Sequence, residues 1–208
     1  MDIFQVIKRV VTEPTAYFRS VGKGKEQLGF AFGYFALLSL VSTLLGLLAS
    51  LTFFSAFFPL IQNMIPLLGA GAGFSGMFTG GALVRNALFS YAFGLGLSFL
   101  WAGLLHVWIL LFGGKRSYAK TYELGAYAGT PALLLGWIPF LGFVGQIWSL
   151  ILLIIGTQEV HGISRTKAIL MYVLPLAVLF VLALFAIVFF LLTFGSIAPF
   201  INNGGLFQ

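Results

Sequence analysis

Long stretches without a formal charge constrain this chain more than any other feature. Residues 28–58, 87–112 and 168–194 contain no Asp, Glu, Lys or Arg. Each is long enough to cross the hydrocarbon core of a bilayer, which takes roughly 20 residues in a helix. The chain is 60% hydrophobic and 8% charged, and 208 residues cannot enclose so much apolar surface in water. The sequence therefore predicts an all-α integral membrane protein and excludes a soluble enzyme.

Two shorter apolar stretches share the segment between residues 121 and 157. The segment is too long for one straight crossing, and Pro139 and Gly142 near its middle favour a tight turn. We therefore expect a five-transmembrane-helix bundle. The predicted spans are about 28–58, 87–112, 121–139, 141–157 and 168–194.

The distribution of Lys and Arg supports this count independently. Five of them precede the first span, three follow the second, two follow the fourth, and Arg85 follows the first. With five spans only Arg85 lies on the opposite side from the others, and basic residues in short loops favour the cytoplasm. We therefore predict a multi-pass protein of the plasma membrane with a cytoplasmic N-terminus and an external C-terminus. The net charge of +6 then reflects topology, and no nucleic-acid partner is expected.

Residues 1–27 form the expected cytoplasmic segment, and residues 28–208 the membrane domain. Apolar residues at helical spacing from Ile3 to Val11 predict an amphipathic helix in the headgroup layer, which Pro14 ends or restarts. The predicted partner is anionic lipid, because basic side chains near the surface attract it. The residues expected to contact headgroups are Lys8, Arg9, Arg19, Lys23 and Lys25.

The only long connection predicted is 59–86, which is rich in glycine. Its composition fits a short interfacial helix and a flexible linker. A re-entrant loop is the alternative, provided that protein or water satisfies its backbone polar groups.

Small residues at intervals of four let membrane helices approach closely. Gly29 and Gly33 form one such pair, and Gly125 and Gly129 form a second, with Pro131 in the same segment. Either internal bundle packing or a seam between two copies explains them, so a homo-oligomer stays open.

Ionisable residues at membrane depth suggest function by default. The predicted topology places His106, Glu123, Glu159 and His161 at similar depth on the cytoplasmic side, close to Tyr127. These groups could bind a cation or relay a proton, and His106, Glu123 and Glu159 are the candidate metal ligands. In the structural alternative the two carboxylates pair with the basic residues nearby, and His106 bonds a backbone carbonyl or Glu123. The candidate partners of the carboxylates are Lys115, Arg116, Lys120 and Arg165.

Catalytic signatures are sparse. The chain has no Cys, so thiolate chemistry is excluded. The segment Gly113-Gly114-Lys115 lacks the earlier glycine of a phosphate-binding loop and continues with Arg116 where Ser or Thr is required. We therefore expect no enzyme and no cofactor.

Several segments resemble a known family of membrane proteins. Residues 113–118 read GGKRSY, and residues 156–164 read GTQEVHGIS. Tyr127 and Pro131 lie between these two segments. Near the N-terminus, Pro14 and Phe18 are also part of the similarity. This pattern resembles the prokaryotic branch of the Yip domain family, named for proteins that interact with Ypt/Rab GTPases. The resemblance implies five spans, a cytoplasmic N-terminus and association with other membrane proteins or with itself. The Asp-Leu-Tyr-Gly-Pro type motif of eukaryotic members is absent, so no Rab partner is implied.

Two hypotheses of function follow. The first is a non-enzymatic protein that organises or scaffolds the membrane or its membrane-protein partners. The second is a small transporter or channel that uses the cytoplasmic His and Glu residues as an ion or solute site.

Overall fold

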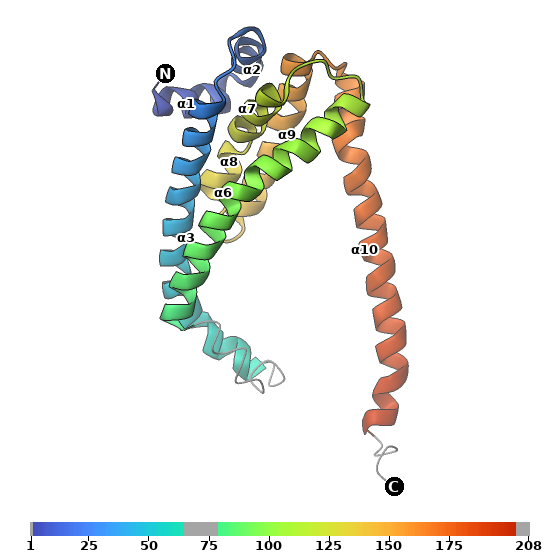
Figure 1. The fold of residues 1–208 in the computed structure, drawn as a ribbon. Helices are drawn as coiled ribbons and strands as arrows, with labels where there is room; N and C mark the ends of the chain where they lie inside the picture. Colours follow the sequence, from blue (N-terminus) through green and yellow to red (C-terminus); the bar gives the residue numbers. More distant parts are fainter. Residues whose placement is uncertain (1, 65–78, 203–208) are drawn as a thin grey trace. The chain divides into compact units, whose positions relative to one another are not determined.

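All the regular secondary structure in the described part of the chain is helical. The computed structural model describes the backbone of residues 2–64 and 79–202, and the side chains of residues 2–52 and 79–193. The chain divides into two compact units, Met1–Arg165 and Thr166–Gln208. The first unit holds α1 (Ile3–Thr12), α2 (Pro14–Lys23), α3 (Leu28–Met64), α6 (Gly80–Leu111), α7 (Tyr118–Ala128), α8 (Thr130–Leu135) and α9 (Leu141–His161) (Figure 1). The last helix, α10 (Arg165–Asn202), makes up most of the second unit.

Four helices are long and apolar enough to cross a membrane in the described part of the chain. They are Leu28–Thr52 of α3, α6, α9 and Arg165–Thr193 of α10. The all-α membrane prediction is thus supported, whereas the prediction of five long spans is not reproduced. The predicted third span, 121–139, consists of the two short helices α7 and α8.

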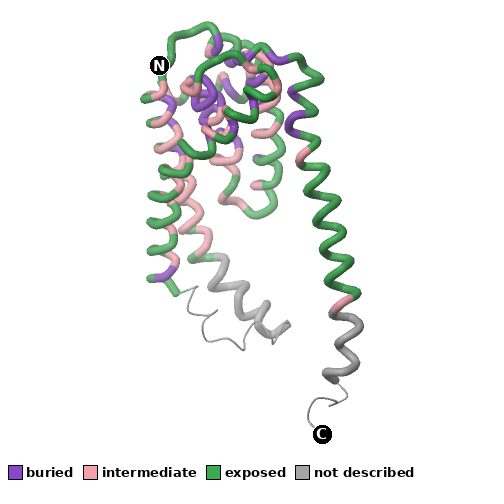
Figure 2. Tube along the Cα trace, turned by 45° about the vertical axis from the view of Figure 1, so that its right-hand side comes forward, coloured by how far each residue is buried: buried purple, intermediate pink, exposed green. Residues whose placement is uncertain are grey.

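The break between α7 and α8 follows from local sequence. Gly129 ends α7, and Pro131 stands in the first turn of α8. Proline lacks the N–H that a continuing helix would use, and its ring clashes with the preceding turn. The short α7 is nevertheless at the centre of the unit, since it packs against α2, α3, α6 and α9. Its buried residues gather where these helices meet (Figure 2).

Helices α8 and α9 form an antiparallel hairpin around the turn at residues 136–140. The start of α9 lies against α8, where Gly145 approaches Pro131. The end of α9 returns to the start of α7, where His161 lies beside Thr121. Helix α9 also continues one turn beyond the predicted end at 157, so Glu159 and His161 belong to its last turn.

The predicted loop 59–86 is shorter than expected. Helix α3 continues to Met64, and α6 begins at Gly80 because the Thr79 hydroxyl accepts a hydrogen bond from the Ala82 N–H at 3.4 Å. Residues 65–78, on which the choice between a linker and a re-entrant loop depends, lie outside the described residues.

The N-terminal helices pack on the bundle through part of their apolar surface. Asp2 caps α1, and Pro14 occupies the first turn of α2. Val6 and Val10 of α1 are fully buried, because α1 packs against α2, α7 and α8. Phe4, in contrast, is 79% exposed. Part of the apolar face of α1 therefore packs against other helices of the protein. The sequence analysis had assigned this face to the membrane surface.

The closest approaches between helices occur at glycines that the sequence analysis did not select. A Cβ at Gly22 would lie 2.9 Å from the Glu159 carbonyl oxygen, and a Cβ at Gly145 would lie 2.7 Å from that of Pro131. Gly29 and Gly33 are exposed and face open space. Internal packing is thus not observed at these two glycines within the first unit, which leaves the other expectation, a seam between two copies, open.

The glycine contacts predict a stability difference between otherwise similar substitutions. Gly22→Ala and Gly145→Ala should each destabilise the protein by about 1–3 kcal/mol, because a backbone carbonyl must move away. Gly33→Ala is the matched control and should leave stability unchanged or raise it by up to about 1 kcal/mol through helix propensity. Thermal unfolding in detergent measures all three, and equal melting temperatures would contradict the packing described.

Candidate functional site: a polar cluster at one end of the bundle

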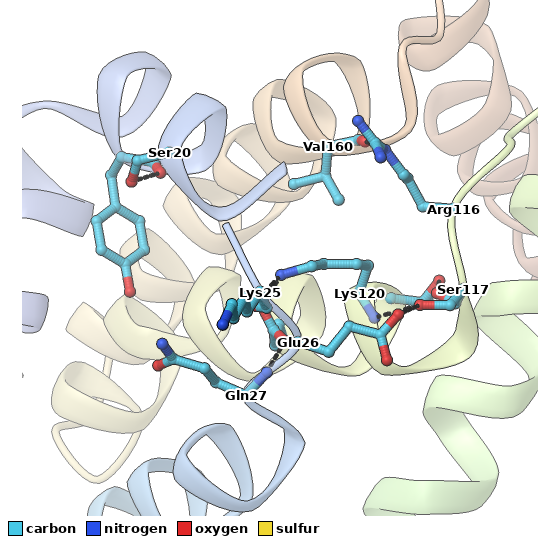
Figure 3. Close-up of polar contacts among 11 residues, drawn as sticks. Ser20, Lys25, Glu26, Gln27, Arg116, Ser117, Lys120 and Val160 are labelled. Atoms are coloured by element: carbon cyan, nitrogen blue, oxygen red, sulfur yellow. Dashed lines mark hydrogen bonds and ion pairs between the residues drawn. The ribbon is translucent and has the colours of Figure 1, made fainter. Parts of the chain in front are cut away.

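Three segments far apart in sequence meet at one end of the first unit. They are the linker 24–27 before α3, the loop 112–117 before α7, and the last turn of α9. The Lys120 ammonium donates to the Lys25 carbonyl at 2.9 Å, and the Arg116 Nε donates to the Val160 carbonyl at 3.3 Å (Figure 3). The Ser117 hydroxyl donates to the Glu26 carboxylate at 2.5 Å. These contacts define the polar cluster.

A buried ion pair lies at the centre of the cluster. Lys120 Nζ is 2.8 Å from Glu123 Oε2, and the two side chains are only 6% and 3% exposed. The other carboxylate oxygen, Oε1, accepts the Gln27 N–H at 2.5 Å. Removing two charges from water is costly unless each is paired and further hydrogen-bonded. Here both conditions are met, and the same contacts hold the linker 24–27 against α7.

The two histidines meet around one threonine. The Thr121 hydroxyl lies 2.8 Å from His106 Nδ1 and 3.2 Å from His161 Nε2. A hydroxyl has a single proton, so at most one imidazole accepts from it and the other must donate. His161 Nδ1 is buried without a hydrogen-bond partner. The sequence analysis placed the two histidines at similar depth and considered a shared site, but it did not identify the threonine that connects them.

Glu159 lies apart from this core and pairs with the N-terminal helices. Its two carboxylate oxygens accept from Arg19 at 2.9 and 3.3 Å, and the side chains of Arg19 and Glu159 are 57% and 21% exposed. The hydrogen bond and the charge of Glu159 raise the pKa of the Arg19 guanidinium. Arg19 is thus engaged with protein, whereas the sequence analysis assigned it to lipid headgroups.

Tyr127 belongs to an aromatic core. Its ring lies edge-on to those of Tyr17 and Tyr34, each at 5.3 Å between centroids. The Tyr34 hydroxyl in turn bonds Thr130 at 2.7 Å. Burial raises the pKa of the Tyr17 hydroxyl. These contacts pack α2 and α3 against α7. Tyr127 therefore belongs to the aromatic core and not to the group formed by the two histidines.

The predicted shared site therefore separates into distinct groups. Glu123 pairs with Lys120, Glu159 pairs with Arg19, and the histidines share Thr121. Among the described residues, no three His, Asp or Glu side chains are placed to hold a metal ion. The proposal of His106, Glu123 and Glu159 as joint ligands is thus not supported. The structural alternative had included the Lys120–Glu123 pair, but it had assigned neither Arg19 nor Thr121.

The packing glycines of α7 have a modest role. A Cβ at Gly125 would make an ordinary contact with Leu105 at 3.9 Å, and Gly129 lies against the carbonyl of Gly125 in its own helix. Pro131 is buried and contacts α9. Close packing of α7 on α9 is instead found at Gly156, where an added Cβ would overlap Leu124.

The segments that carried the family resemblance are the ones that meet in this cluster. Arg116 bonds the Val160 carbonyl, and Gly114 and His161 are also neighbours, since a Cβ at Gly114 would lie 3.3 Å from His161 Nδ1. A family profile described as the Yip1 domain matches residues 8–187. The chain belongs to the Yip1 domain family. This confirms the resemblance stated from the sequence. No curated protein and no solved structure matched the chain.

The two ion pairs of this Yip1 domain should differ sharply in their effect on stability. Glu123→Gln keeps an acceptor for the Gln27 N–H but leaves the Lys120 charge buried and unpaired, so we expect a loss of about 3–5 kcal/mol. The matched substitution Glu159→Gln breaks the more exposed pair and should cost at most about 1 kcal/mol. Thermal unfolding in detergent compares the two variants. A Glu123→Gln protein as stable as Glu159→Gln would mean that the buried pair does not hold the linker.

Proposed function

We propose that this Yip1-family protein is a non-enzymatic scaffold of the plasma membrane. In this proposal the bundle holds α1 and α2 as a fixed platform on the cytoplasmic surface, where the platform contacts anionic lipids and partner membrane proteins or a second copy. The observation that carries the proposal is that the buried charged side chains of the polar cluster bond to the linker before α3. These side chains, Lys120 and Glu123, bond the linker to α7, so they stabilise the attachment of the platform.

The packing of α2 supports a rigid platform. Gly22 of α2 lies directly against the backbone of α9, and Phe18 lies beside Gly156. The Arg19–Glu159 pair adds a third link between the two helices. On its outer side the platform presents Phe4 and Lys8, both exposed. An apolar and a basic side chain together suit the boundary between headgroups and hydrocarbon.

Five crossings, with the N-terminus inside and the C-terminus outside, remain the topology that we propose. Helices α7 and α8 have 11 and 6 residues, and residues 118–135 would extend about 27 Å at 1.5 Å per residue, close to the ~30 Å hydrocarbon core. Their polar groups are bonded within the protein, as the Lys120–Glu123 and Tyr34–Thr130 contacts illustrate. A broken helix is acceptable at membrane depth where protein encloses it.

This topology makes a direct prediction about accessibility. In intact cells a cysteine introduced at position 8 should resist a membrane-impermeant thiol reagent, and one introduced at position 206 should react. The natural chain has no Cys, so each label reports one site. Lysed cells provide the control, in which both positions should react. Reaction of both, or of neither, in intact cells would indicate an even number of crossings.

A small transporter or channel is the second candidate, and a different site now favours it. A groove of about 340 Å³ lies among α3, α6 and α8. Its lining includes the hydroxyl side chains of Ser39, Ser42, Thr43 and Ser90, and the Ser39 hydroxyl is buried without a hydrogen-bond partner. Unsatisfied buried polar groups need an explanation, and a polar solute would provide one. This groove replaces the His and Glu cluster as the candidate solute site.

Crosslinking from the platform separates the two functions. A photoreactive residue at Phe4 in native membranes should give defined adducts with membrane proteins or with a second copy. The same residue at Leu88, an exposed position near the other end of α6, should give lipid adducts only. The purified protein in vesicles should show no ion or solute flux above that of empty vesicles. Flux that Ser39→Ala reduces, together with no protein adducts at Phe4, would favour the transporter.

A further inference from the structure

A second groove, distinct from the one between the spans, opens at the polar cluster. It encloses about 570 Å³ between the end of α2 and linker 24–27 on one side and the loop before α7 on the other. Sites for small ligands typically enclose 300–1,000 Å³. Basic side chains from both walls line it: Lys23, Lys25, Lys115, Arg116 and Lys120. The sequence analysis had assigned Lys23 and Lys25 to a diffuse headgroup contact, and it had not joined them to Lys115 and Arg116.

Most of this positive charge is not neutralised by the protein. Lys120 is committed to Glu123, and Arg116 uses its Nε–H on the Val160 carbonyl, which leaves the guanidinium charge unpaired. Lys23, Lys25 and Lys115 are exposed and have no ion-pair partner among the described residues. Among the residues that the structure describes, Glu26 is the only carboxylate lining the groove, and Ser117 holds it at 2.5 Å. Four cations therefore face one anion, and the excess favours an anionic ligand.

The walls of the groove are fixed before any ligand arrives. The Lys120–Lys25, Ser117–Glu26 and Gln27–Glu123 hydrogen bonds connect the linker to the start of α7 (Figure 3). These bonds join segments more than 90 residues apart in sequence. The backbone that carries the basic side chains is therefore ordered in advance, so binding does not bear the cost of ordering these two segments.

The groove also adjoins the ends of two candidate membrane spans. Lys25 comes just before α3 begins at Leu28, and Lys115 comes just after α6 ends at Leu111. Both helices are candidate membrane spans, so in a spanning orientation these cations would lie beside the hydrocarbon core, in the headgroup region. A phosphate group attached to a lipid reaches this position without leaving the bilayer.

We propose that this groove binds the phosphate of an anionic membrane lipid, with Lys23, Lys25, Lys115 and Arg116 as its charge partners. The proposal deepens the proposed lipid contact and rests on the placement of this end of the bundle at the membrane surface. Lys and Arg are the side chains that bind phosphate oxygens in proteins. The Glu26 carboxylate repels an anionic ligand, so it weakens binding, whereas the four cations strengthen it.

The test measures binding of the first lipid to the full-length protein by native mass spectrometry in a neutral detergent. The probes are phosphatidylglycerol, phosphatidylcholine, and soluble glycerol 3-phosphate and inorganic phosphate. Phosphatidylglycerol should bind best, and neither soluble phosphate should displace it at equal concentration. The double variant Lys25→Gln/Lys115→Gln should weaken phosphatidylglycerol binding about 10- to 30-fold, since each basic residue near the surface contributes appreciably. Glu26→Gln should strengthen the binding severalfold.

A second double variant separates a defined site from general attraction. Arg85→Gln/Lys167→Gln removes the same charge from exposed positions outside the groove and should change the affinity less than twofold. Equal losses in the two double variants would overturn the site, because they would show a response to net charge alone. Displacement by inorganic phosphate at the same affinity would overturn the assignment to a lipid. Neither result would affect the protein adducts expected from Phe4, so failure here is distinguishable from failure of the scaffold proposal.

Discussion

The structure of the first unit depends on one buried ion pair. Lys120 and Glu123 stand a single helical turn apart on α7, and both are almost fully removed from solvent. Such a pair is tolerated only where further hydrogen bonds satisfy the remaining donors and acceptors. The linker before α3 provides these bonds through the Lys25 carbonyl and the Gln27 N–H. The charges on α7 therefore hold the linker between α2 and α3 in place.

The position of α7 explains how so polar a helix is accommodated in an apolar protein. It is surrounded by α2, α3, α6 and α9, so its Lys, Glu, Thr and Tyr side chains find partners on every side. The longer helices α3, α6 and α9 carry most of the apolar surface that is exposed on this unit. This division of roles supports a bundle in which a short central helix connects the polar end, and long helices meet the lipid.

The same polar end combines the features used in both proposals. Helix α2 lies against α9 at Gly22, and the segments with the family resemblance, around residues 113–118 and 156–162, meet beside it. The contacts that hold the platform also form the walls of the basic groove. A scaffold function and a lipid phosphate site are thus compatible. The buried pair holds the segments that carry the exposed basic side chains, and most of those side chains stay free of ion pairs among the described residues.

The sequence by itself determined that the protein lies in a bilayer, that it is helical and that it belongs to this family. Uncharged stretches of sufficient length leave a helix as the only spanning structure that bonds its own backbone, and the segments around 113–118 and 156–164 were sufficient for the Yip resemblance. It also predicted that His106 and His161 lie at similar depth on the same side of the membrane. Only the tertiary structure decided that Glu123 and Glu159 have separate partners, that Thr121 connects the imidazoles, and that Gly22 and Gly145 rather than Gly29 and Gly33 make the close contacts. The physical reason is that periodicity fixes which residues share a face of a helix, whereas partner choice between helices depends on distances of about one hydrogen bond, which sequence spacing does not set.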